Sequence, residues 1–164
     1  MKRSLISSII FGLLSFPAIS QNTETPITKA WEEFSNNKKQ SEYVGLKWDL
    51  LGPVINSGRI EALDAVPETP NVIYAGFGSG NLWKTTNHGL SWRPIFDNHP
   101  GYSIGDVKIA PSNPNIVYVA TGEALRAKRG HTIAGAGVYR SDDAGETWKA
   151  LGLEGTYHIS RITV

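Results

Sequence analysis

The chain has 164 residues, of which 16 are Lys or Arg and 15 are Asp or Glu, so its formal net charge is +1. This balance, without a basic stripe or a polybasic segment, argues against nucleic acid and anionic lipid as partners. Cysteine is absent, which excludes disulfides, thiol catalysis and cysteine-bound zinc. From these residues we expect no metal and no cofactor.

The N-terminus has the order of a secretory signal peptide. A basic start and an apolar run over 4–16 precede the small residues Ala18 and Ser20. We expect a signal peptide over 1–20, cleavage after Ser20, and export to the periplasm, cell surface or exterior. The apolar run is too short for a membrane span, so we expect none in the mature chain; a buried first helix is the alternative.

Residues 21–43 form a polar leader with little apolar periodicity. Within it, Thr25 followed by Pro26 is typical of a helix start, because threonine caps and proline fits the first turn. A short helix is therefore expected to run through Trp31 and Phe34.

Two copies of a hairpin motif stand out, S-D-D-A-G-E-T-W at 141–148 and T-T-N-H-G-L-S-W at 85–92. In each, an Asp or Asn side chain can bond to the turn backbone, and the glycine can take the positive φ that closes the hairpin. The tryptophan is expected to pack, buried, under its own turn. The residues assigned this structural role are Thr85, Asn87, Gly89, Trp92, Ser141, Asp143, Gly145 and Trp148.

The surrounding sequence repeats as well. Residues 66–75 match 110–119 at an offset of 44, whereas the hairpin glycines are 56 apart, so the second unit carries a 12-residue insertion between Gly122 and Val138. Four short strands per unit are typical of a propeller blade. We expect strands near 60–66, 72–76, 82–85 and 91–95, then near 104–110, 116–120, 138–141 and 147–151.

Partial units flank these two. Residues 48–51 read as a closing strand, and 158–164 as the start of a third unit. Two blades cannot close a ring. The fold expected for 44–164 is therefore all-β, the N-terminal portion of a β-propeller with the remainder downstream; ring assembly by several copies is the alternative.

These motifs resemble the secreted Asp-box (BNR) repeat propellers of the sortilin-like and glycosyl-hydrolase-like superfamily, which includes sialidases. The resemblance rests on the hairpins, on the P-x-x-P-N-x-x-Y units at 67–74 and 111–118, and on G-N-L-W-K-T-T-N at 80–87. It covers the last 120 residues or so and implies a propeller without selecting one function. In the xyloglucan-degrading endoglucanases of this group, the catalytic Asp aligns with Gly78, so we expect no catalytic residue here.

The insertion is the segment that the repeat does not explain. Long loops on a rigid scaffold are common binding elements, so we expect a protein or carbohydrate ligand on the face carrying 123–137. The alternative is the N-terminal part of a glycoside hydrolase whose catalytic residues lie mainly downstream. Arg59 and Arg161 are expected to begin inner strands at the same face. The candidate ligand-binding residues are Arg59, Glu123, Arg126, Lys128, Arg129, His131 and Arg161.

Overall fold

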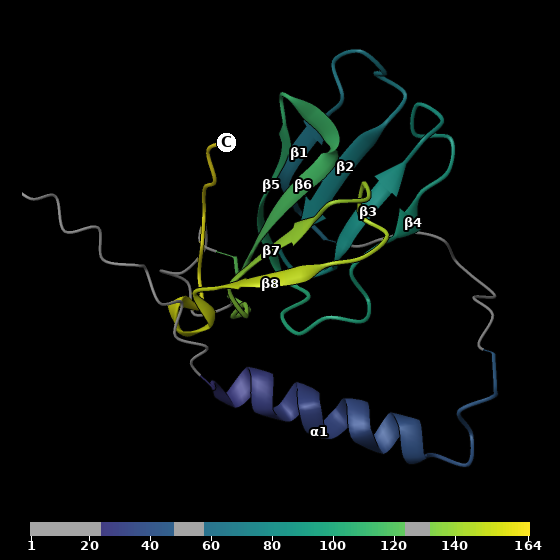
Figure 1. The fold of residues 1–164 in the computed structure, drawn as a ribbon, viewed down its shortest axis with the longest axis vertical. Coiled ribbons are helices and arrows are strands. Elements are labelled where there is room, and N and C mark those ends of the chain that lie inside the picture. The colour runs from purple at the N-terminus through teal and green to yellow at the C-terminus, as the bar shows by residue number, and fades with distance from the viewer. Residues whose placement is uncertain (1–23, 48–57, 124–131) are drawn as a thin grey trace, which may run out of the picture.

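The computed structural model describes residues 24–47, 58–123 and 132–164. It contains one α-helix and two four-stranded antiparallel sheets (Figure 1). The signal peptide and the closing strand expected at 48–51 lie outside the described residues. Within those ranges, every helix is too short or too polar to span a bilayer.

Helix α1 runs from Pro26 to Gln40, six residues beyond Phe34. Thr25 caps it: its hydroxyl accepts the Thr28 N–H at 3.2 Å, and the Thr28 hydroxyl accepts the Thr25 N–H at 2.8 Å. This reciprocal pair satisfies two backbone donors that a helix start leaves open. The helix lies outside the two sheets (Figure 1).

Each sheet is a meander whose strands follow chain order, which confirms the predicted mostly-β class with blade-like units. The first sheet, blade 1, contains β1 (Ile60–Ala65), β2 (Ile73–Phe77), β3 (Leu82–Thr85) and β4 (Arg93–Pro94). The second, blade 2, contains β5 (Ile104–Ala110), β6 (Asn113–Thr121), β7 (Val138–Ser141) and β8 (Lys149–Gly152). A 3-10 turn, η2, follows at Glu154–Thr156.

The third unit does not form a strand in the described part of the chain. Residues 158–164 instead run alongside β5 (Figure 1), where the Ile162 N–H donates to Asp106 Oδ2 at 2.8 Å. The segment thus lies beside the inner strand of blade 2, but no ladder partner orders it as a strand.

The Asp-box hairpins have the expected geometry. Ser141 Oγ accepts the Gly145 N–H at 2.8 Å, and Asp143 Oδ1 accepts the Thr147 N–H at 2.8 Å. The glycine has φ +93°, and Ala144 before it has φ +57°. Thr85 and Asn87 make the equivalent bonds in blade 1. The motif therefore satisfies its turn backbone with its own side chains.

A carboxylate joins the inner strands β1 and β5, which share no ladder. Asp64 Oδ1 accepts the N–H of Ala65 at 3.0 Å, while Oδ2 accepts the Ile109 N–H of the next blade at 2.8 Å. Asp106 repeats this pattern, accepting from Val107 at 3.0 Å and from Ile162. We call this two-sided contact the Asp bridge.

The second Asp-box docks on blade 1. The Ala144 carbonyl accepts from the Tyr74 hydroxyl at 3.0 Å and from Lys84 Nζ at 2.7 Å. Trp148 donates its indole N–H to the Ile95 carbonyl at 2.9 Å, and its ring meets Phe96 edge-to-face at 5.4 Å. Burial raises the pKa of Tyr74 to about 12, so its hydroxyl remains a donor at neutral pH.

Blade 1 exposes the sheet face whose equivalent in blade 2 is buried against blade 1. Ile60 and Leu63 are more than half exposed, whereas Ile104 and Val107 at the equivalent positions are fully buried. Trp92 is 39% exposed; the expectation that it would be buried is wrong, because its own turn covers only part of the ring and no described segment covers the rest. We call this surface the open face; it forms a groove of about 590 Å³.

Trp148 tests the docking contact. Trp148→Ala removes ring packing and the bond to Ile95, and should lower the free energy of unfolding by about 3 kcal/mol. Trp148→Phe keeps most of the packing and should cost about 1 kcal/mol through the unpaired carbonyl. Denaturant unfolding of both variants measures the difference; a loss below about 1 kcal/mol for the alanine variant would contradict a docking role.

Asp143 tests the hairpin through pH. Hydrogen bonds from the Thr147 side chain and backbone, and from Ser141, lower the pKa of Asp143 to about 2. Because the folded pKa lies below the unfolded value near 4, the carboxylate's contribution is present above pH 4 and is lost between about pH 4 and pH 2. In the Asp143→Asn variant, the free energy of unfolding should depend less on pH in that window. Asn87 makes the equivalent hydrogen bonds in blade 1 with a side chain that does not titrate. An NMR titration placing the Asp143 pKa near 4 would disprove this.

Candidate functional site

The charged side chains that the sequence singled out gather at one end of the sheets. This loop end carries the β2–β3, β4–β5 and β6–β7 connections, while the opposite turn end carries the Asp-boxes and the proline turns. Arg59 lies just before β1, and Glu123 just after β6. The meanders bring both to the loop end, although 64 positions separate them in sequence.

Arg59 binds two carboxylates there. Its guanidinium donates to both oxygens of Glu123 and lies 2.9 Å from Glu61 Oε1. The arginine side chain is 32% exposed, whereas the two carboxylate side chains are 4% and 0% exposed. A planar guanidinium can hold a carboxylate with two parallel bonds, so the cluster is an ion triad of two buried carboxylates and a partly exposed guanidinium.

Gly78 makes room for this triad. A Cβ at this position would lie 2.9 Å from Glu61 Cγ and 3.2 Å from the Glu123 carboxyl carbon. The position that aligns with a catalytic Asp therefore serves here as space for two other carboxylates. Glu61 was not among the candidate residues; its i+2 spacing from Arg59, which puts both on one face of an extended segment, was the available signal.

Both ends of the 123–137 insertion are hydrogen-bonded to residues at the edges of the sheets. On the outgoing side, the Glu123 N–H donates to Ser103 Oγ at 3.0 Å, and that hydroxyl donates to the Gly78 carbonyl at 2.6 Å. On the returning side, the Ala136 N–H donates to Thr121 Oγ1 at 2.7 Å. The loop end therefore presents the insertion from a hydrogen-bonded base.

The other candidate residues do not join the triad. Arg161 lines a cavity of about 390 Å³ near the turn end, together with Asp64, Pro67 and Pro111. The expectation that Arg59 and Arg161 lie at the same face is therefore wrong, because the C-terminal segment runs along β5 toward the turns. The remaining candidates lie outside the described residues: Arg126, Lys128, Arg129 and His131.

The residues that the structure describes offer no metal site. Across 24–47, 58–123 and 132–164, no three His, Asp or Glu side chains are arranged to hold a metal ion. Among the described residues, the chemistry that the loop end offers is that of a partly exposed guanidinium held by two buried carboxylates.

Comparisons with known proteins give partial structural matches. No family model and no curated protein matches the chain. An ancestral GH74 enzyme is 29% identical with a TM-score of 0.45, over 56% of this chain and 12% of its own. The GH74 xyloglucanase from Xanthomonas campestris is 17% identical with a TM-score of 0.42, over 57% and 15%. A YCF48 protein bound to D1 peptide is 22% identical with a TM-score of 0.41, over 63% and 28%. The chain thus spans 12 to 28% of the length of these proteins, and its similarity to GH74 and YCF48 β-propellers is partial.

Proposed function

We propose that this chain is part of an exported β-propeller that binds a protein or glycan ligand at its loop end. The observation that carries the proposal is the fixed base of the 123–137 insertion. A loop held at both feet by a rigid sheet can present side chains to a ligand without destabilising the fold. The order of 1–20 supports export.

Charge suggests which ligand group is bound. Glu61 and Glu123 already hold the Arg59 guanidinium, so this arginine is not free to bind a ligand anion. The insertion contributes Arg126, Lys128 and Arg129, three cations too close in sequence to share a dry core. An acidic group on a peptide or glycan is the complementary partner.

The loop is tested by replacing 125–131 with a short Gly-Ser turn in the full-length protein. The replacement must stop before 132, because Gly135 and Ala136 pack on Thr121 and Gly101. The exported product, checked by mass spectrometry for Gln21 as first residue, is screened against acidic peptide and glycan arrays. We expect the melting temperature to change by only a few degrees while binding falls, most strongly at low salt.

Two results would overturn the proposal. A loop variant that fails to fold would make the insertion a packing element, and undiminished binding would place the ligand elsewhere. A product that retains Met1 inside the cell would remove export.

A glycoside hydrolase is the second candidate, favoured by the two carboxylates beside Gly78. Paired carboxylates are what glycoside hydrolysis requires, and Glu61 and Glu123 are the pair that this part of the chain brings together. Their near-complete burial and their shared arginine favour a structural role instead.

Glu123→Gln separates the two roles. A structural triad predicts a loss of about 2 kcal/mol in unfolding free energy, because the buried Glu123 side chain loses its charge-assisted contact with Arg59, with no change in ligand binding. An enzyme predicts reducing-sugar release from xyloglucan by the full-length protein, abolished in the variant. Hydrolysis by the wild type that is lost without loss of stability would favour the hydrolase.

A further inference from the structure

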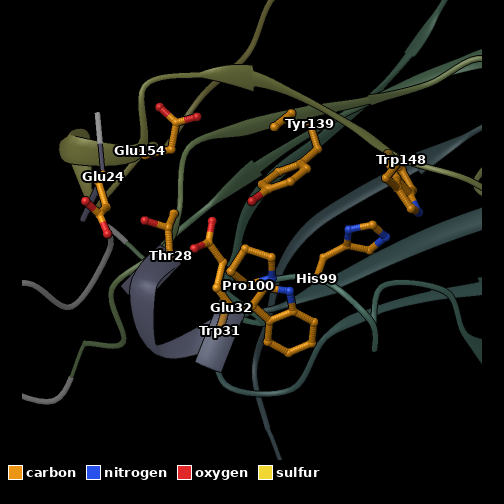
Figure 2. A pocket seen from close by; sticks show the side chains of 10 residues that line it. Glu24, Thr28, Trp31, Glu32, His99, Pro100, Tyr139, Trp148 and Glu154 are labelled. Atoms are coloured by element: carbon orange, nitrogen blue, oxygen red, sulfur yellow. The ribbon is translucent and has the colours of Figure 1, made fainter. Parts of the chain in front are cut away.

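A second cleft lies away from the loop-end triad, between α1 and the seam of the two blades. Figure 2 shows Trp31 and Glu32 of α1 beside His99 and Pro100 of the β4–β5 connection, with Tyr139 and Trp148 of blade 2 above them in the view. The cleft has a volume of about 380 Å³. This falls within the range of small-ligand pockets.

Aromatic rings form much of its wall, and packing sets their orientation. Trp148 is held by its bond to the Ile95 carbonyl and by the edge of Phe96. Tyr139 meets Phe96 edge-to-face at 5.1 Å, and His99 stacks on the same ring at 4.8 Å. The wall is therefore preorganised on the blade side.

The charges of the cleft are all negative. Among the ten residues lining it, Glu24, Glu32 and Glu154 are acidic, and neither lysine nor arginine is present. Glu154 is only 5% exposed, and its Oε2 has no hydrogen-bond partner among the described residues. A buried carboxylate oxygen without a partner is rare in folded proteins and points to a missing donor.

The titratable rings do not supply that positive charge. Burial lowers the pKa of His99, so the imidazole is neutral at pH 7. Burial, and then the charge of Glu154, raise the pKa of Tyr139 to about 12, so the phenol also stays neutral. Neither ring therefore adds a positive charge to the cleft at neutral pH.

We propose that this cleft binds an organic cation, the ammonium or guanidinium group of a lysine or arginine side chain in a peptide. Such a group gains cation–π attraction from the tryptophan rings and a charge-assisted bond to Glu154. The volume accommodates one long basic side chain. The proposal is independent of the loop-end function, because it uses none of the residues of that site.

The probes are the blocked tripeptides Gly-Arg-Gly and Gly-Lys-Gly, with Gly-Gln-Gly as the neutral control and cellotetraose as the glycan control. Binding to the full-length protein is followed by NMR of the indole N–H signals of Trp31 and Trp148. We expect saturable shifts with both basic peptides only, weakened by salt. Glu154→Gln should lower affinity at least about fivefold, and Glu32→Gln should lower it about twofold.

Glu33→Gln is the matched control, since Glu33 neighbours Glu32 on the exposed side of α1 and does not line the cleft. The affinity of the Glu33 variant for both basic peptides should equal that of the wild type.

Equal losses of affinity in the Glu32 and Glu33 variants would show unspecific charge attraction and overturn the site. Shifts caused equally by Gly-Gln-Gly, or by cellotetraose alone, would overturn the cation assignment, as would the absence of any shift at millimolar peptide. If Glu154→Gln unfolds, the Glu32 and Glu33 pair still decides the matter.

Discussion

The Asp bridge is the interaction on which the arrangement of the two sheets depends. Strands β1 and β5 lie side by side without sharing a ladder, so the backbone donors facing the seam need acceptors from outside their own sheet. At Ile109 the β5–β6 register shifts, and the donor at this irregularity finds Asp64 of the other blade. With the inner strands fixed in this way, Gly76 lies against Ile104, where any Cβ would collide at 2.4 Å. The core between the blades follows from that close approach.

The same constraint explains which parts of the fold could be predicted from the sequence. The hairpins are encoded in contiguous residues, because a serine or threonine, an acid or amide, and a glycine complete their own bonds. The repeat offset then located all eight strands within a few residues. Asp64 escaped prediction because its partner belongs to another sheet, and a one-residue change in register would aim it elsewhere. Trp92 shows the same limit: the same turn motif gives a more exposed tryptophan where no neighbouring blade covers it.

The candidate sites follow this division between local and distant contacts. Arg59 and Glu123 were recognised by type and position, but the burial of Glu123 beside Glu61 depends on Gly78, which leaves space for both carboxylates. The cleft under α1 was not predicted, because Trp31 comes from a leader with weak periodicity and Glu154 from a turn without a motif. Aromatic and acidic side chains from four separate segments converge there only after both blades and the helix are placed.

The open face of blade 1 has a consequence for handling the protein. Leu90 is 88% exposed and lines, with Trp92, a surface that includes Ile60 and Leu63, whose counterparts Ile104 and Val107 in blade 2 are fully buried. Apolar patches of this kind promote self-association in water. Cutting the chain between β4 and β5 would create a second such patch on the remaining blade. The tendency of a recombinant fragment to aggregate therefore depends on where the chain is cut, and not only on the stability of the sheets.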